Sequence, residues 1–306
     1  MRKLDLSVKL GKLKLKNPVM VASGVFGYGL EYADICPPES LGAVITKGVS
    51  LKPCAGNQPP RIWETPSGMI NAIGLENVGI DRLIEEKLPP LVKRGATVIA
   101  NFYGSTVEEY AETARRLSEA PGLAAIEANI SCPNIGGKKG LYFGSTPEMA
   151  AKVTKAIRKS ADLFLIVKLT PQVSDIAEVA CAVQEAGADA ISLINTIPAM
   201  AVDVRSRKPR IANITGGLSG PAIHPIAVRM VWQAARAVKI PVIGIGGIMT
   251  PEDAVEFIIV GARAVQLGTV MFTNPSAPLE IIEGIKSFMG EQGISTISEL
   301  VGSIIL

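Results

Sequence analysis

Large aromatic side chains are scarce in this sequence: Phe, Trp and Tyr make up 5% of the 306 residues, whereas hydrophobic residues make up 48%. A core built instead from Ile, Val, Leu and Ala is typical of parallel strands buried on both faces. The longest apolar run, IPVIGIGGIM at 240–249, is about half as long as a membrane span needs. We therefore expect no transmembrane segment.

Cysteine and histidine are also rare. The single histidine cannot form a Ser/His or metal-His site by itself, and the four cysteines show no paired spacing. Without a CxxC pattern the chain cannot hold an iron–sulfur cluster or a structural zinc alone. Because no carboxylate pair or metal-ligand cluster appears either, we expect no metal and neither metal-dependent hydrolysis nor glycosidase chemistry.

Net charge is small, with 31 Lys and Arg against 28 Asp and Glu. A surplus this small and dispersed argues against nucleic acid or a membrane surface as a partner. The N-terminus MRKLDLSVKLGKLKLK is interrupted by charges and does not resemble a signal peptide. We expect a cytoplasmic protein with reduced thiols.

Short β-branched runs alternate with amphipathic helical stretches, a pattern typical of βαβ units. We predict one (β/α)8 TIM barrel domain over residues 1–306, with a β-hairpin at 6–15 beneath it and helix caps at Thr106, Thr146 and Thr250. The connections 49–77 and 196–220 are predicted to be long βα loops covering the active site. The eight predicted strands are 18–22, 43–48, 97–102, 124–131, 164–169, 190–195, 241–247 and 264–268.

Polar residues stand where six of these strands end, and such side chains face the cleft of a barrel. Lys168 lies inside the apolar run LFLIVKLT, and a buried ammonium is costly unless an anion or strong acceptor compensates it. The alternative for Lys168 is a side chain that snorkels to water. Taken together, the six favour a site; they are Ser23, Lys47, Asn101, Asn129, Lys168 and Asn195.

Glycines cluster after the last two strands, at Gly244, Gly246 and Gly247 and again at Gly268-Thr269. These two loops form the phosphate cradle of many barrels, with backbone N–H groups as donors. The segment 216–220, GGLSG, either adds donors to this cradle or forms a lid hinge.

One thiol differs from the others. Cys132, in NISCPN at 129–134, lies on a turn at the reactive end of the barrel, where polar neighbours can activate it. We interpret Cys36 and Cys181 as core fillers and give Cys54 no role. His224 is interpreted as a surface or capping residue.

Several motifs, in order and over nearly the whole chain, resemble the dihydroorotate dehydrogenase family. They are KLKNPVMVASGVFGYG, TKGVSLKP, RIWETPSGMINAIGLEN, NISCPN, VKLTP, NT at 195–196, GGLSGPAI, IGIGGI and QLGT. Within the family the chain is most similar to the NAD-linked class 1B catalytic subunit, because Cys132 stands where the membrane-associated class has Ser. His224 departs from the Lys that is more usual in the phrase GPAIKPIA.

The resemblance implies FMN as cofactor and dihydroorotate as substrate. It places the FMN phosphate on Gly246, Gly247, Gly268 and Thr269, and the ring near Ser23, Lys47, Gly48, Asn101, Asn129, Lys168, Ile194 and Gly220. Substrate contacts carry over to Lys47, Asn71, Ala72, Ile73, Gly74, Leu75, Asn129, Asn195 and Thr196.

These assignments suit the chemistry of dihydroorotate oxidation in pyrimidine biosynthesis. A Cys132 thiolate can take the proton from C5 while the hydride leaves C6 toward the flavin, and a cation at Lys168 would stabilise the reduced flavin. The resemblance further implies a partner subunit that carries FAD and a 2Fe–2S cluster and passes electrons to NAD, in a heterotetramer of two catalytic and two electron-transfer chains.

Other functions stay open at this point. The nearest are a fumarate-dependent class 1A enzyme and a flavoprotein similar to dihydropyrimidine dehydrogenase. A phosphate-binding barrel without flavin, either an isomerase or aldolase or an inactive binding subunit, is the alternative from another class.

Overall fold

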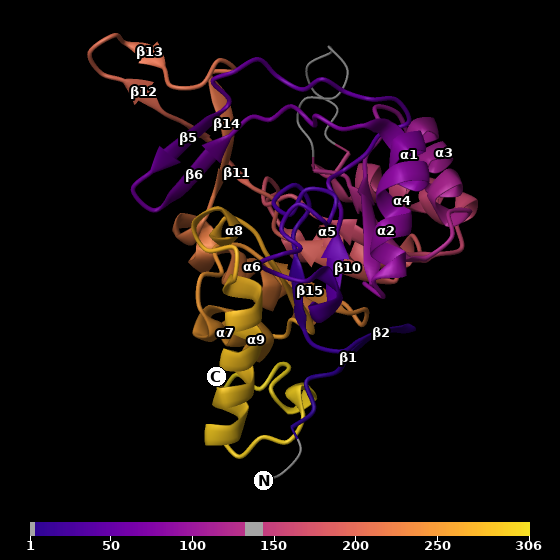
Figure 1. Cartoon of the computed structure of the whole chain (residues 1–306), viewed down its shortest axis with the longest axis vertical. Coiled ribbons are helices and arrows are strands. Elements are labelled where there is room, and N and C mark those ends of the chain that lie inside the picture. The colour runs from indigo at the N-terminus through magenta and orange to yellow at the C-terminus, as the bar shows by residue number, and fades with distance from the viewer. Residues whose placement is uncertain (1–3, 132–142) are drawn as a thin grey trace.

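Eight parallel strands close into a barrel, as predicted (Figure 1). The computed structural model describes residues 4–131 and 143–306. Going around the barrel, the strands keep their chain order, and the last strand pairs with the first. Each of the eight predicted runs contains one strand, namely β3 (Val19–Val21), β4 (Ala43–Ile45), β7 (Val98–Phe102), β8 (Leu123–Asn129), β9 (Phe164–Lys168), β10 (Ala190–Leu193), β15 (Val242–Ile245) and β16 (Ala264–Leu267).

Helices cover the outside of the barrel and begin at the predicted caps. The side chains of Thr106, Thr146 and Thr250 each accept a backbone N–H from the first turn of the helix that follows. None of the helices in the described ranges is both long and apolar enough to cross a bilayer. The longer helices are α3 (Val107–Ser118), α4 (Pro147–Ser160), α5 (Ile176–Glu185), α6 (His224–Ala237), α7 (Pro251–Ile259) and α9 (Ala277–Glu291).

Shorter helical turns complete the outer layer. Between β4 and β7, a π-helical turn η2 separates two short helices. The short elements are η1 (Pro38–Ser40), α1 (Gly79–Arg82), η2 (Leu83–Lys87), α2 (Leu88–Lys93), η3 (Pro221–Ile223), α8 (Val270–Thr273) and η4 (Ile297–Glu299).

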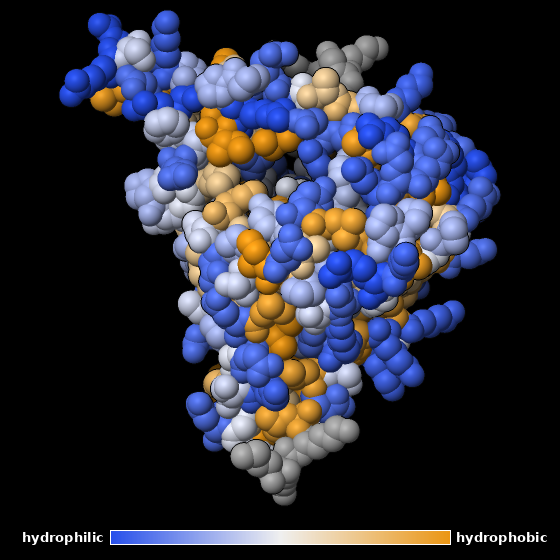
Figure 2. Space-filling view, viewed as in Figure 1, coloured by the Kyte–Doolittle hydropathy of each residue, from blue (hydrophilic) through white to orange (hydrophobic). Residues whose placement is uncertain are grey.

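The connections 49–77 and 196–220 are more ordered than the predicted loops, since together they form a second, antiparallel sheet. Its order is β11-β14-β6-β5, and a small hairpin of β12 and β13 extends from it (Figure 1). Figure 2 shows a hollow in the surface between this sheet and the lobe of α1 and α3. The strands are β5 (Ile62–Thr65), β6 (Gly68–Asn71), β11 (Ile197–Met200), β12 (Val202–Asp203), β13 (Lys208–Pro209) and β14 (Thr215–Ser219).

Glycines in this sheet allow neighbouring strands to approach closely. A Cβ at Gly216 of β14 would lie 2.5 Å from the carbonyl oxygen of Asn71 in β6. A Cβ at Gly68 would collide with the carbonyl of Ser219 in the same way. The segment 216–219 is therefore strand rather than hinge, and only Gly220 forms the turn that follows.

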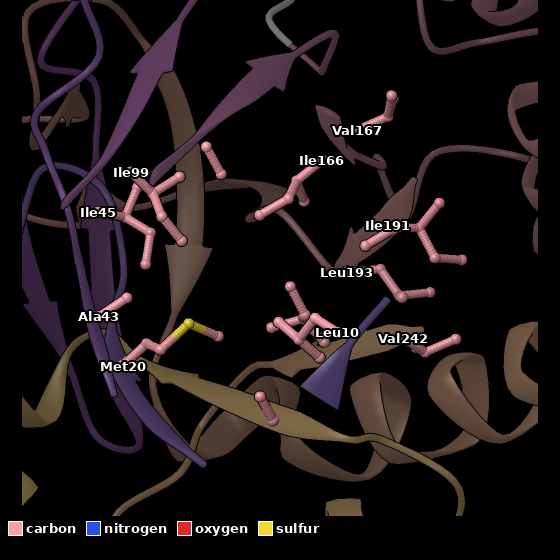
Figure 3. Packing of buried hydrophobic residues seen from close by; sticks show 14 of the residues in the cluster. Leu10, Met20, Ala43, Ile45, Ile99, Ile166, Val167, Ile191, Leu193 and Val242 are labelled. Carbon is pink, nitrogen blue, oxygen red and sulfur yellow. The ribbon is translucent and has the colours of Figure 1, made fainter. Parts of the chain in front are cut away.

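The N-terminal hairpin lies at the end of the barrel where the strands begin. Its strands β1 (Val8–Leu10) and β2 (Leu13–Leu15) pair in antiparallel fashion, and Leu10 is fully buried. At Gly11, with φ of 55°, a Cβ would lie 3.1 Å from the ring of Phe164, the first residue of β9. Figure 3 shows Leu10 among the barrel side chains. The hairpin closes this end, which leaves the opposite end for a site.

Aliphatic side chains fill the barrel on both faces of its strands. Every residue of β4, β7, β10, β15 and β16 is buried. In Figure 3, Met20, Ala43, Ile45 and Ile99 project from neighbouring strands into one apolar cluster. Full burial of each large aliphatic side chain stabilises the fold by about 1.5–3 kcal/mol. The predicted aromatic-poor core is confirmed.

Candidate active site

Three of the six predicted polar residues meet at the carboxyl ends of β8, β9 and β10. Asn129 and Lys168 end their strands and are direct partners in the parallel ladder. Beyond β10, the amide of Asn195 donates to Asn129 Oδ1 over 3.3 Å, and Asn195 Oδ1 accepts the backbone N–H of Thr196 over 2.8 Å. The two asparagines thus flank the strand that carries the lysine.

Lys168 is buried, with 5% of its surface exposed. Its ammonium forms neither a hydrogen bond nor an ion pair with any residue in 4–131 or 143–306, so the alternative of a lysine that snorkels into water does not describe it. An ammonium in such a place needs an anion or acceptor. The geometry is that of a cation available to a bound anionic or electron-rich group.

The glycine loops after β15 and β16 come together with the turn at Gly220. A Cβ at Gly247 would lie 2.7 Å from the carbonyl oxygen of Gly220, and one at Gly220 would lie 3.6 Å from Thr269 Cγ2. Within the described chain, the backbone N–H groups of Gly246, Gly247, Gly268 and Thr269 have no hydrogen-bond acceptor. A Cβ at Gly268 would meet nothing within 4 Å. Free N–H groups around open space fit a phosphate.

His224 holds one side of this cradle. It begins α6 with a mostly buried side chain, whose Nδ1 lies 3.1 Å from the carbonyl oxygen of Gly246 and whose Nε2 lies 2.8 Å from Glu256 of α7. The prediction of a surface or capping role was wrong, because the imidazole bridges two elements. With Asp253 it also places three potential metal ligands within 4.8 Å, although Asp253 Oδ2 already accepts the backbone N–H groups of Met249 and Thr250.

Asn71 and Thr196 lie on opposite sides of strand β14. The amide of Asn71 lies 3.5 Å from the carbonyl oxygen of Gly217, and Thr196 packs directly against the Cα of Gly217. The predicted substrate residues at 71–75 and 195–196, more than a hundred positions apart in sequence, therefore border one region. Of that stretch, Ala72 is buried and Ile73 to Leu75 are half-buried.

A cluster behind the 71–75 stretch fixes its last residue. Leu75 has a positive φ of 58°, and its carbonyl oxygen accepts from Asn77 Nδ2 over 2.8 Å and from the Tyr103 hydroxyl over 3.2 Å. Asn77 also donates to Tyr103 over 2.9 Å. Burial raises the pKa of Tyr103 to about 12, so this hydroxyl stays a proton donor at neutral pH. Sequence reasoning missed both side chains.

Lys47 is joined to the same stretch through an acid. Its ammonium lies 3.6 Å from Glu76 Oε1, and Arg61 holds the other oxygen of that carboxylate. The hydrogen bond from Arg61, followed by the charge of Lys47, lowers the pKa of Glu76 from its usual value of 4.5. Lys47 thus stands at the mouth of the barrel in a long ion pair with Glu76.

The other residues predicted near the ring border the cleft at different depths. Asn101 is buried in β7, and a Cβ at Gly48 would lie 2.6 Å from its Oδ1. Ile194 is buried and donates its N–H to the carbonyl oxygen of Ile245 over 2.9 Å. Ser23 is half-buried just beyond β3.

Cys132 lies outside the described residues. Ser131, immediately before it, is buried and its hydroxyl donates to the carbonyl oxygen of Lys168 over 2.9 Å. Of the other thiols, Cys36 is buried, which raises its pKa to about 11, as suits an inert core residue. Cys181 is only half-buried, so it is not the core filler that was predicted.

Glu127 is a further polar residue at this end of the barrel that sequence reasoning overlooked. It is fully buried and hydrogen-bonds side chains from three other strands. Its signal was present in the run AAIEANIS, where one acid interrupts an apolar strand. A buried carboxylate, like the buried ammonium of Lys168, is costly unless polar partners compensate it.

A (β/α)8 barrel with free N–H groups after its last two strands has the arrangement that many barrels use to bind phosphate. The family model for dihydroorotate dehydrogenase matches residues 5–289. The chain belongs to this family.

Several similar proteins share the name "Dihydroorotate dehydrogenase B (NAD(+)), catalytic subunit". The protein from Trichlorobacter lovleyi is 57% identical over 299 residues, which cover 98% of each chain. That from Geotalea uraniireducens is 55% identical over 305 residues and the full length of both chains. In Geobacter metallireducens the identity is 54% over 304 residues, or 99% of each chain.

Proposed function

We propose that this chain is the catalytic subunit of an NAD-linked dihydroorotate dehydrogenase, which oxidises dihydroorotate to orotate in pyrimidine biosynthesis. Membership of the family and the shared name of its relatives support the reaction. The structural observation that carries the proposal is Lys168, a buried ammonium without a partner in the described chain, at the same end of the barrel as a cradle of free N–H groups.

FMN fits the residues present. The N–H groups of Gly246, Gly247, Gly268 and Thr269 would hold its phosphate, and the open space at Gly268 leaves room for it. The ring would be held by Lys168, Asn101, Gly48 and Asn129. When bound, FMN supplies the acceptor for the hydride that leaves C6 of the substrate. The remaining ring neighbours in this proposal are Ser23, Lys47, Ile194 and Gly220.

Dihydroorotate would bind over the ring between the barrel mouth and the second sheet. Paired amides such as Asn129 and Asn195 offer donor and acceptor groups together, which suits a planar pyrimidine. Lys47 supplies positive charge for the substrate carboxylate. The stretch 71–75 and Thr196 would close the site from the sheet side.

Cys132 would remove the proton from C5. The residue before it, Ser131, donates its hydroxyl to the backbone carbonyl of Lys168 at the carboxyl end of β9, and this contact supports the assignment. A thiolate near fixed positive charge is favoured over the thiol. With the hydride going to the flavin, the cysteine needs to move only a proton.

A partner subunit would carry the electrons onward. The words "catalytic subunit" in the names of the relatives support such a partner. We propose that it carries FAD and a 2Fe–2S cluster, passes electrons to NAD, and assembles in the cytoplasm into two catalytic and two electron-transfer chains.

One experiment tests the proposal against its alternatives. The chain is purified alone and after co-expression with a candidate iron–sulfur flavoprotein, and its flavin spectrum and dihydroorotate-dependent NAD reduction are measured. We expect one FMN per chain and NAD reduction only in the complex. Turnover of the isolated chain with fumarate would instead support a class 1A enzyme, and failure to take up FMN would support a barrel without flavin.

A further inference from the structure

Two charged side chains are buried in the described part of the chain, and they lie near each other. Lys168 ends β9, and Glu127 lies in the neighbouring strand β8, two residues before the ladder partner of Lys168. Two residues of strand span about 6.6 Å. No ion pair within 4 Å joins the two side chains in the described part of the chain, so Glu127 does not hold the ammonium.

Glu127 accepts hydrogen bonds from three strands besides its own. Asn101 of β7 donates to Oε1 over 2.7 Å, while Ser192 of β10 and Gln266 of β16 donate to Oε2 over 2.8 and 2.7 Å. All four side chains are 1% exposed or less. Every contact brings a donor to the acid, which is the arrangement that an ionised carboxylate requires.

The orientation of Gln266 shows how strongly the acid directs its neighbours. The Nε2 group of Gln266 points to Glu127, while its Oε1 is buried with no hydrogen-bond partner among the described residues. Reversing the amide would place two oxygens against each other. Gln266 Oε1 therefore stays unpaired because the Nε2 end of the same amide is bound to the carboxylate.

The need to bring an N–H donor to the Glu127 carboxylate also decides which end of the Asn101 amide faces the cleft. Because Nδ2 is held by Glu127, Oδ1 is the free end, and it lies beside Gly48, where a Cβ would approach it to 2.6 Å. Asn101 therefore presents its carbonyl oxygen, an acceptor, at the position proposed for the flavin ring.

We infer that Glu127 is a positioning residue for the flavin site. It sets the amide orientation of Asn101, and its charge balances that of Lys168 without capturing the ammonium, which stays free for a ligand. This inference rests on the proposed function, because the group being positioned is FMN.

The test compares Glu127→Gln with the wild-type chain and with Ser192→Ala, which removes one hydrogen bond from the network but keeps its charge. The measurements are the FMN dissociation constant of the apoprotein and the midpoint potential of the bound flavin. For Glu127→Gln we expect FMN binding to weaken about tenfold, because the new amide no longer compels Asn101 to present its oxygen. The potential should become more positive, because a negative charge near the reduced flavin is lost.

Ser192→Ala should leave the potential unchanged. Equal shifts of the flavin midpoint potential in Ser192→Ala and Glu127→Gln would overturn the inference and make the network merely structural. In an Asn101→Ala background, Glu127→Gln should shift the potential but weaken FMN binding little further. A full second loss of affinity there would contradict the orienting role.

Glu127→Asp provides a second variant should Glu127→Gln fail to fold. It keeps the charge and withdraws the carboxylate from Asn101, so FMN affinity should fall while the potential stays close to that of the wild type. Unchanged affinity in this variant would overturn the inference. If wild-type apoprotein binds no FMN, the proposed function fails instead, and the two failures are thereby distinguished.

Discussion

The side-chain amides of Asn129 and Asn195 are hydrogen-bonded to each other over 3.3 Å, across the strand that carries Lys168. Asn195 Oδ1 in turn accepts the N–H of Thr196, so each amide is held in one orientation. A rigid pair of amides can discriminate between ligands by the positions of donors and acceptors. This pair is where we expect substrate recognition to be most sensitive.

Asn195→Ala should raise the KM for dihydroorotate about tenfold, since one polar contact to the substrate is lost and Asn129 is no longer oriented. FMN content should stay unchanged. Steady-state kinetics with an artificial electron acceptor check this. Asn213→Ala, at an exposed position near β14, is the matched control and should behave as wild type. An unaltered KM in Asn195→Ala would remove this residue from the substrate site.

Lys168→Met should slow flavin reduction about a hundredfold, because a fixed charge that stabilises the reduced flavin is replaced by an apolar side chain of similar length. Stopped-flow absorbance under anaerobic conditions measures the rate of the half-reaction directly. Lys152→Met, on the exposed face of α4, serves as the control. If Lys168→Met were reduced at the wild-type rate, the lysine would be structural.

The ion-paired Glu76 predicts a specific acid sensitivity. Because Arg61 and Lys47 lower its pKa in the folded state, the pairing stabilises the fold above about pH 4.5 and is lost as the pH falls through the lowered pKa. Glu76→Gln should therefore show a weaker dependence of unfolding free energy on pH as the pH falls below about 4.5. Urea titrations across this range test it, with the exposed Glu64→Gln as control. Parallel profiles for wild type and Glu76→Gln would contradict it.

The barrel was predictable because each strand carries its own signal. Leu123–Asn129 and Phe164–Lys168 are short, mostly apolar runs that end in a polar side chain, and the carboxyl ends of barrel strands meet on one face. Local pattern and global fold agree there. The helix caps at Thr106, Thr146 and Thr250 are local for the same reason.

The second sheet was not predictable from local pattern. Pro198 lies within β11, and Gly216 and Gly217 lie within β14, although both residue types are unfavourable in strands. These strands form because their partners approach closely across more than a hundred residues of chain, as between Asn71 and Gly217. Tertiary contacts outweigh propensity in this case.

The Glu127 network was missed for a related reason. Its donors lie 26, 65 and 139 positions away in sequence. No spacing rule connects such residues, and only the closure of the barrel brings them together. His224 is similar, because its partner Glu256 belongs to the next helix, 32 residues later.

The cap of α7, the helix that follows the glycine loop after β15, offers a test of how much one helix cap stabilises the fold. Thr250→Ala removes the hydroxyl that accepts the N–H of Asp253, and it should lower the free energy of unfolding by about 1 kcal/mol. Thr250→Ser keeps the cap and should restore stability. Chemical denaturation monitored by circular dichroism distinguishes them. Equal stability of the two variants would show that the capping box contributes nothing.

Cys132 is the sharpest remaining test of the chemistry. Cys132→Ala should retain FMN but lose turnover with dihydroorotate about a hundredfold or more, because no group is left to take the proton from C5. Cys132→Ser should keep a small residual rate, which rises with pH because the serine hydroxyl is less acidic than the thiol and ionises only at higher pH. Cys181→Ala, at a half-buried position remote from the cleft, is the control. Near-native turnover of Cys132→Ala at neutral pH would mean that another residue is the base. Exchange of solvent deuterium into C5 of the substrate would then measure the proton transfer independently of turnover.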